Sequence, residues 1–518
     1  METLRAWSRH ASSTSEMSIV DRIRQHQSDL IFGSVVIATA LAAGALATVV
    51  GARLIAAILM LGVVVALFSR TRLWIGLAAA AVPFSGSLGI RGGGAFVAAC
   101  DLLAMLALAS FIMTRQDNAK LPDGESSRLR YFLLRPTKPG LILLGVYIVT
   151  AALNVYLANP SASAWITVAQ RAELIGVWLL FGACAYAAKA IPLALGAFVA
   201  TAAVQAAVWI TTPGVKGVLG AQKNPSGGFI AAAILIVLLS SVRNWYRLPL
   251  LALLTGGLIA TGSRGSIIGL VAALAVLIIF VRQWGRVIFP LAAIIVAGFG
   301  ALRFLPDSVS ERLFSQNSAG VYNSRIREVF VDDAMYQFHQ APWSGVGVGN
   351  YEQITASLSR VDTHDPHNVF VLALVEGGYP LGVAFALLCV GTLIWLLRRR
   401  KTTLVALALV VQISTLAHAY VDVYWVRGTP VVGWMLIGAA AASTYSWQRS
   451  RRDGGGASAN RQDRPYREAS WSVDRPPARL SEHVHTRGPP GCRRRGNWPY
   501  PPRSLQLSSV AAQHPRRQ

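Results

Sequence analysis

Long runs of apolar residues, mostly Leu, Ala, Val and Ile, alternate with short polar intervals over most of the chain. An apolar helix of about 20 residues crosses a hydrocarbon core of about 30 Å. The pattern therefore predicts an all-α polytopic membrane protein with about 12 to 14 transmembrane helices. The expected spans are residues 31–50, 54–69, 73–90, 95–114, 139–158, 164–188, 191–211, 227–242, 248–263, 266–281, 287–304, 367–396, 402–418 and 429–446.

Basic residues fall in every second interval between these spans. Loops rich in Lys and Arg stay on the cytoplasmic side of a membrane, so both chain ends are predicted to be cytoplasmic. The intervals on the opposite, periplasmic or exterior side are then residues 91–94, 159–163, 211–226, 263–265, 305–366 and 418–429. Residues 305–366 form the largest of them and are expected to be a periplasmic loop.

The two ends of the chain differ from its middle. Residues 1–29 are polar, and the apolar run that follows lacks a clear cleavage site, so this run is predicted to be an anchor rather than a signal peptide. Residues 30–446 form the predicted membrane domain. Residues 447–518 are rich in Arg, Pro, Gly and Ser without apolar periodicity, which predicts a disordered cytoplasmic tail.

Composition supports the membrane class. The chain is 53% hydrophobic, yet it carries 48 Lys and Arg against 24 Asp and Glu, a formal charge of +24. In a soluble protein this charge would suggest nucleic acid, whereas here it marks topology and contact with membrane lipids, and no nucleic-acid partner is expected. Of the four cysteines, three lie in apolar runs, so neither a disulfide framework nor a metal cluster is implied.

Residues 325–382 are the part of the chain where His, Arg, Asp, Glu and Trp concentrate, around a Gly-Val-Gly-Val-Gly run. Successive glycines let backbone N–H groups turn toward an anion or a close-approaching ligand. His364 and His367 come just before a long apolar segment, so His367 is expected near a helix N-terminus at a membrane face. The positive end of a helix disfavours imidazolium, which keeps a histidine available as a neutral base.

At other polar positions a functional role is weighed against a structural one. Arg264, predicted at the outer membrane face, fits anion binding better than a snorkelling boundary arginine. Arg171 and Glu173 fit a local ion pair or a lipid-phosphate contact equally well. Lys216 precedes an Asn-Pro turn that an ordinary loop explains equally well. Asp101 is expected to be a partnered structural carboxylate.

Two further clusters are better explained by structure than by ligand or metal binding. The polar patch at residues 418–427 is better explained by an interfacial aromatic belt than by carbohydrate contacts. His364 and His367 flank Asp365 and Pro366, but the proline prevents helical spacing of the two imidazoles and no distant ligand set completes a shell. No metal or other cofactor is therefore expected.

Five motifs, taken in order, resemble the O-antigen ligase/polymerase superfamily of bacterial glycan assembly. They are Thr261-Gly-Ser-Arg264-Gly, then Arg325 or Arg327, then Pro342-Trp-Ser-Gly-Val-Gly-Val-Gly-Asn350, then His367-Asn368, then Glu376-Gly-Gly-Tyr-Pro-Leu-Gly382. The resemblance covers roughly residues 30–440. The chain departs from the pattern at Ser226, which replaces an Asn, at Gly382, and at Lys216, where the family has an arginine.

The resemblance implies a GT-C-like fold and an integral-membrane glycosyltransferase of the bacterial inner membrane, with its site facing the periplasm. The donor would be a polyprenyl-diphosphate-linked glycan and the acceptor another glycan or a lipid-linked sugar. It implies that His367 is the general base and that the diphosphate is held by positive side chains. The implied substrate-binding residues are Arg264, Arg325, Arg327, Lys216, Arg171, Asn368 and His364.

Two questions stay open in the sequence. Ligases and polymerases share these motifs and differ in the acceptor, which nothing in the sequence selects. A transporter of an anionic lipid-linked substrate would also have many spans and membrane-embedded arginines. A histidine in a large outer loop favours the glycosyltransferase.

Overall fold

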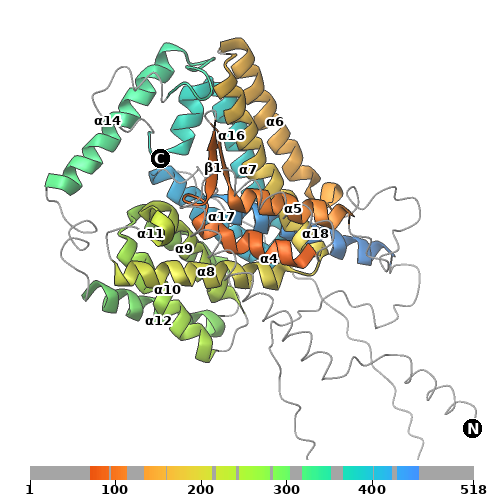
Figure 1. Cartoon of the computed structure of the whole chain (residues 1–518), viewed down its shortest axis with the longest axis vertical. Coiled ribbons are helices and arrows are strands. Elements are labelled where there is room, and N and C mark those ends of the chain that lie inside the picture. The colour runs from red at the N-terminus through yellow and green to blue at the C-terminus, as the bar shows by residue number, and fades with distance from the viewer. Residues whose placement is uncertain are drawn as a thin grey trace, which may run out of the picture. The chain divides into compact units, whose positions relative to one another are not determined.

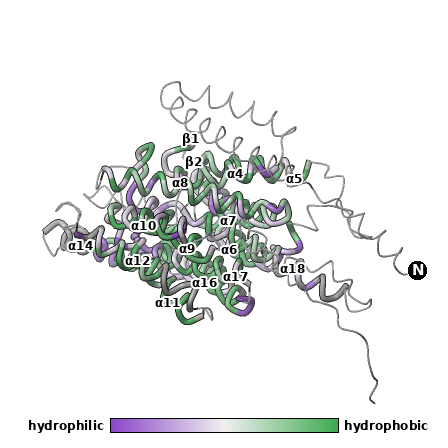
Figure 2. The backbone as a smooth tube through the Cα atoms, turned by 90° about the horizontal axis from the view of Figure 1, so that it is seen from below, coloured by the Kyte–Doolittle hydropathy of each residue, from purple (hydrophilic) through white to green (hydrophobic). Residues whose placement is uncertain are grey.

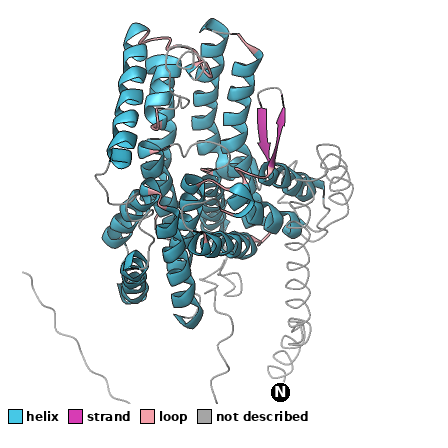
Figure 3. Cartoon of the chain, turned by 60° about the vertical axis from the view of Figure 1, so that its left-hand side comes forward, coloured by secondary structure: helices cyan, strands magenta, loops and turns pink. Residues whose placement is uncertain are grey.

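The computed structural model describes residues 71–92, 95–113, 133–158, 160–212, 217–240, 244–280, 284–303, 318–351, 366–400, 402–422 and 429–453. These residues are almost entirely helical (Figures 1 and 3). The helices of the first half are α4 (Thr71–Ala81), α5 (Ala99–Met113), α6 (Arg135–Ala158), α7 (Ala162–Ala187), α8 (Ile191–Thr211) and α9 (Lys223–Leu239). Those of the second half are α10 (Asn244–Thr261), α11 (Arg264–Phe280), α12 (Trp284–Arg303), α14 (Ser318–Gln340), α16 (Val369–Arg399), α17 (Thr403–Val421) and α18 (Val431–Asp453).

The prediction of an all-α polytopic membrane protein is confirmed. Within the part of the chain that the structure describes, five helices are long and apolar enough to cross a membrane, namely α6, α7, α8, α16 and α17, and shorter apolar helices accompany them. Apolar residues cover most of the helical tube in Figure 2. The expected spans 31–50 and 54–69 lie outside the described residues, as does most of the tail. The last helix continues to Asp453, past the predicted boundary at residue 446.

Two expected spans are shorter than predicted. The apolar run at 73–90 is helical only as far as Ala81, and Pro83 then lies in a 3₁₀ turn, η1 (Val82–Phe84). Next comes an antiparallel hairpin of β1 (Gly89–Gly92) and β2 (Ala95–Ala98), after which α5 begins at Ala99 rather than at residue 95. Proline removes a backbone donor and glycine favours turns, so this apolar sequence leaves the helix early.

Close helix packing in the membrane domain depends on small residues. A Cβ added at Gly182 of α7 would lie 1.8 Å from the carbonyl oxygen of Met435 in α18, and one at Gly438 would lie 1.9 Å from the Leu179 oxygen. The two backbones are therefore in direct contact. Helices in lipid associate through this kind of close approach because apolar side chains gain little by leaving lipid for a neighbouring helix.

A separate small core joins α14 to α16. It consists of Ala334 and Phe338 of α14, Tyr351 and Val375. The 23-residue helix α14 lies within the predicted periplasmic loop 305–366 and packs beside α16 (Figure 1). Helix α16 is itself broken at Gly377 and Gly378, so a short first part, residues 369–376, is set off from the long remainder.

Candidate active site

His367 occupies the predicted position, immediately before α16. Asn368 caps this helix, because its side-chain oxygen accepts hydrogen bonds from the backbone N–H groups of Phe370 at 3.0 Å and Val371 at 3.3 Å. His367 has a φ of +53°, in the left-handed region that a branched or bulky side chain seldom adopts. The cap and the turn together fix the imidazole at the helix N-terminus.

Asp422 lies at the centre of the site. It follows the last turn of α17, and its side chain is only 2% exposed. Its Oδ1 lies 3.2 Å from Nδ1 of His367 and accepts a hydrogen bond of 2.8 Å from the Asn224 amide. Its Oδ2 lies 3.3 Å from Nη2 of Arg327. One carboxylate thus joins residues from α9, α14, α17 and the turn before α16.

Arg327 reaches this carboxylate from α14. Besides its ion pair with Asp422, its Nη1 donates to the carbonyl oxygen of Val421 at 3.0 Å. The side chain is still 36% exposed, although both of its terminal nitrogens have partners. One turn along α14, Phe330 stacks on the His367 ring, with centroids 6.2 Å apart and an interplanar angle of 14°. Helix α14 therefore contacts both His367 and the residue that orients it.

The start of α11 forms one wall of the site. A Cβ added at Gly265 would lie 2.5 Å from Cδ2 of His418 and 3.2 Å from Cβ of Asp422, so only glycine fits there. Ser266, the next residue, lies 3.5 Å from Nδ1 of His418 and 2.7 Å from the Ser263 hydroxyl. Arg264 is the first residue of α11 and is exposed, which places a cation and a helix N-terminus beside the Asp422 cluster.

The predicted substrate-binding residues separate in the structure. Arg327 joins the Asp422 cluster, and Arg325 is exposed on the same helix. Asn368 acts as a helix cap, and Arg171 forms an ion pair with Glu376. The partner of Arg171 is thus not Glu173, its neighbour in the sequence, but a carboxylate 205 positions away on α16. A further two predicted residues, Lys216 and His364, lie outside the described residues.

Sequence reasoning missed Asp422. The pattern of aromatic residues around it favoured an interfacial belt for the whole patch 418–427, whereas the structure buries Asp422 and His418 in the site. Asn224 was seen as part of an Asn-Pro turn, but not as a donor to a carboxylate 198 positions away. An Asp directly after a long apolar run was the signal in the sequence that could have indicated it.

The glycine-rich run was expected to turn its N–H groups toward an anion or a ligand. In the structure several of these groups point at α16 instead, and the backbone N–H of Gly349 donates to the Glu376 carboxylate at 3.0 Å. Within the described residues, no three His, Cys, Asp or Glu side chains are arranged as metal ligands. Asp101 is partnered as expected, accepting a hydrogen bond of 2.8 Å from the Trp178 indole.

Comparison with known proteins agrees with the resemblance found in the motifs. Residues 249–386, which include Arg264, Arg327 and His367, match the family model described as O-Antigen ligase. The chain is also 30% identical over 217 residues to the O-antigen ligase of Pseudomonas aeruginosa, a match that covers 39% of this chain and 49% of that protein. The match thus spans about half the length of that relative. Over residues 249–386 the chain is therefore similar to the O-antigen ligase family.

Proposed function

We propose that this multi-pass protein lies in the bacterial inner membrane and transfers a polyprenyl-diphosphate-linked glycan to an acceptor hydroxyl at the periplasmic face. The observation that carries the proposal is the contact of the Asp422 carboxylate with both His367, at 3.2 Å, and Arg327, at 3.3 Å. Transfer from a diphosphate needs a base for the acceptor and positive charge for the leaving group. Here a base and a cation share one buried carboxylate.

His367 is the general base in this proposal. A carboxylate oxygen at Nδ1 favours the tautomer that carries its proton on Nδ1, which leaves the basic lone pair on Nε2. Nε2 then takes the proton from the acceptor hydroxyl, and Asp422 stabilises the imidazolium that forms. Asp422 is a positioning residue for His367, and it does not itself need to bind the substrate.

The arginines act on the donor. The acceptor oxygen attacks the anomeric carbon as the proton moves to His367, the bond from that carbon to the diphosphate oxygen breaks, and its electron pair leaves with the polyprenyl diphosphate. In this proposal the diphosphate is bound by Arg264, which is exposed at the start of α11, by the exposed Arg325 and by the partly exposed Arg327. Helix N-termini and guanidinium groups both favour such anions, and Lys216 would add a further positive charge.

The acceptor is proposed by chemical class, either a lipid-linked core sugar or another carrier-linked glycan. Both present a hydroxyl group to His367, so the same site serves a ligase and a polymerase. The donor already carries its leaving group, and the proposed chemistry therefore requires neither a nucleotide nor a metal ion. The remaining partners are the surrounding membrane lipids, and no nucleic acid takes part.

Reconstituted protein distinguishes this proposal from a transporter. The wild-type chain is placed in lipid vesicles with a fluorescent polyprenyl-diphosphate oligosaccharide and a lipid-linked sugar acceptor, and product is followed by mass and by movement of the donor between leaflets. The proposal predicts a new glycosidic bond and release of polyprenyl diphosphate. Movement of the donor across the bilayer without any new glycosidic bond would show a transporter instead.

A further inference from the structure

The glycine-rich segment between α14 and the His367 turn folds against the break in α16. We call residues 341–351 the glycine loop. Its backbone pairs with α16 at the break: the N–H of Val346 donates to the Val375 oxygen at 2.8 Å, and that of Gly347 donates to the Glu376 oxygen at 2.8 Å. In return the N–H of Tyr379 donates to the Pro342 oxygen at 2.8 Å. The break in α16 leaves these backbone groups open for pairing with the loop.

Two glycines, one on each side, make this contact possible. Gly345 has a φ of +64°, and a Cβ there would lie 2.5 Å from the backbone carbon and oxygen of Glu376. Gly378 has a φ of +66°, and a Cβ there would lie 2.5 Å from the backbone carbon of Trp343. Each glycine thus permits both an unusual backbone conformation and a close approach. The two segments interlock as backbone on backbone.

Side chains from two other helices fasten the loop. Asn154 of α6 accepts from the N–H of Val348 at 3.0 Å and donates to the Ser344 oxygen. Glu376 accepts from the N–H of Gly349 at 3.0 Å through Oε1 and pairs with Arg171 of α7 through Oε2. The side chain of Glu376 is 5% exposed and that of Arg171 is 17% exposed, so this ion pair is largely shielded from water.

The glycine loop is connected to the proposed catalytic groups on both sides. Tyr351, at the end of the loop, donates to the Phe330 oxygen at 3.2 Å, and Phe330 stacks on His367. The loop also holds the C-terminal end of α14, the helix that brings Arg327 to Asp422. On the α16 side, only residues 369–376 separate the His367 turn and its cap from the break.

We propose that Arg171 and Glu376 are positioning residues whose ion pair holds the glycine loop against α7. The loop in turn sets α14 and the first part of α16 in the geometry that brings Arg327 and His367 to Asp422. This role rests on the function proposed above and replaces the direct binding of diphosphate by Arg171. Small displacements of reacting groups are costly, since a shift of about 1 Å lowers a rate by about 10²-fold. The pair therefore governs the reaction without contacting the substrate.

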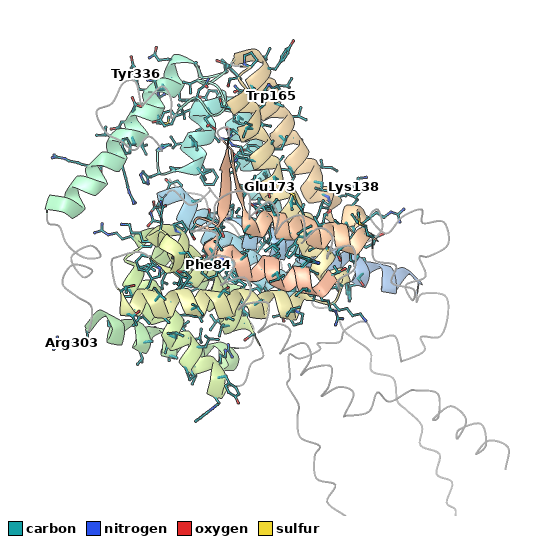
Figure 4. The ribbon with its side chains drawn as sticks, in the orientation of Figure 1. Phe84, Lys138, Trp165, Glu173, Arg303 and Tyr336 are labelled. Atoms are coloured by element: carbon teal, nitrogen blue, oxygen red, sulfur yellow. The ribbon has the colours of Figure 1, made fainter. Side chains whose placement is uncertain are left out.

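We call the ion pair of Arg171 and Glu376 the clamp. A distance measurement tests its positioning role independently of activity. Spin labels are attached to cysteines at Tyr336 of α14 and Trp165 of α7, two exposed residues that Figure 4 labels on their helices. Cys492 is replaced by Ser, and the buried Cys100, Cys184 and Cys389 are kept because labels do not reach them. The full chain is measured in phosphatidylglycerol/phosphatidylcholine nanodiscs by pulsed electron paramagnetic resonance.

Glu376→Gln keeps an oxygen for the Gly349 N–H but removes the charge that Arg171 pairs with, and Arg171→Met removes the other partner. Each is expected to broaden the distance distribution, and the double variant is expected to broaden it no further, because both changes break one interaction. Arg171→Lys retains the positive charge but lacks the planar guanidinium, so it should give a distance distribution of intermediate width. Glu328→Gln makes the same chemical change at an exposed site of α14 and should leave the distribution narrow.

Transfer of a fluorescent polyprenyl-diphosphate oligosaccharide, measured on the same samples, separates the two proposals. The clamp predicts that Glu376→Gln and Arg171→Met lower the transfer rate by about 10²-fold together with a broadened distribution, whereas His367→Ala lowers it with a narrow one. Narrow distributions in both clamp variants, with transfer lost only in Arg171→Met, would overturn the clamp and return Arg171 to the substrate. If both variants broaden the distance distribution and the wild-type protein itself forms no glycosidic bond, the clamp is upheld and the proposed function is refuted.

Discussion

His367 and Asp422 lie 55 positions apart in the chain, yet Nδ1 of the histidine is 3.2 Å from Oδ1 of the aspartate. Asp422 follows α17 and His367 precedes α16, so the contact joins the ends of two neighbouring helices. Arg327 reaches the second oxygen of the same carboxylate from α14. A carboxylate that orients a histidine in this way fixes which ring nitrogen is basic.

The first prediction concerns this carboxylate. Asp422→Asn keeps the size of the side chain but removes its charge, so the imidazolium loses its stabilising partner and the Nδ1–H tautomer is no longer favoured. We expect the transfer rate to fall by about 10²-fold or more, with the protein still present in the membrane. Asp332→Asn, on the exposed face of α14, is the matched control and should retain the wild-type rate. Equal rates in the two variants would remove Asp422 from the mechanism.

The second prediction concerns Gly265, which packs against His418 and Asp422. A methyl group there would lie 2.5 Å from the His418 ring, so Gly265→Ala should push the start of α11 away from the site. We expect the free energy of unfolding to fall by about 1–3 kcal/mol and transfer to fall with it. Gly196→Ala on α8, where nothing lies within 4 Å of the added atom, should be neutral or slightly stabilising. Both are measured by thermal unfolding in detergent. A stability loss at Gly196 equal to that at Gly265 would contradict the packing argument.

The membrane helices were predictable because their signal is local. An apolar run long enough to span lipid has few alternatives to a helix, and the starts of α8 at Ile191 and of the His367 turn were placed correctly. The early end of α4 was missed because its run stays apolar through Pro83 into the hairpin. Hydrophobicity alone does not show where a proline or a glycine ends a helix.

The site was only partly predictable because its pairings are not local. His367 and Arg327 stood out as polar residues in an apolar chain, but their shared partner Asp422 lies among aromatic residues that suggested a membrane-interface belt. The glycine run was expected to turn toward an anion or a ligand, whereas its backbone pairs with α16. That its partner is the broken helix α16 depends on the break at Gly377 and Gly378, which lies inside the single span expected at residues 367–396.

The third prediction assigns Arg264 to donor binding. A guanidinium binds a diphosphate through two parallel hydrogen bonds, which an ammonium does not reproduce. We expect Arg264→Ala to abolish transfer and to weaken donor binding, and Arg264→Lys to leave little activity. Arg303→Ala changes an exposed arginine at the end of α12 and should have no effect on transfer. Full activity of Arg264→Ala would show instead a boundary arginine that anchors the helix.

The fourth prediction concerns orientation in the membrane. The alternation of basic intervals predicts that Ser318 lies outside the cell membrane and Ser458 inside. Single cysteines at these positions, introduced after replacement of Cys492, are treated with a membrane-impermeant maleimide in spheroplasts. Ser318→Cys should react before lysis and Ser458→Cys only after it. The reverse order would invert the topology and place His367 on the cytoplasmic side.

The rate of glycan transfer by His367→Ala tests most directly whether His367 is the general base. Removal of a positioned base lowers a rate by about 10²- to 10⁴-fold, whereas loss of a structural histidine mainly lowers the amount of protein. The variant is purified beside wild type and His339→Ala, an exposed histidine at the end of α14, and transfer is expressed per mole of folded protein with donor binding measured in parallel. If His367 is the general base, His367→Ala still binds the donor but transfers it at least about 10²-fold more slowly, while His339→Ala matches wild type. Transfer by His367→Ala at the wild-type rate would show that His367 is not the general base.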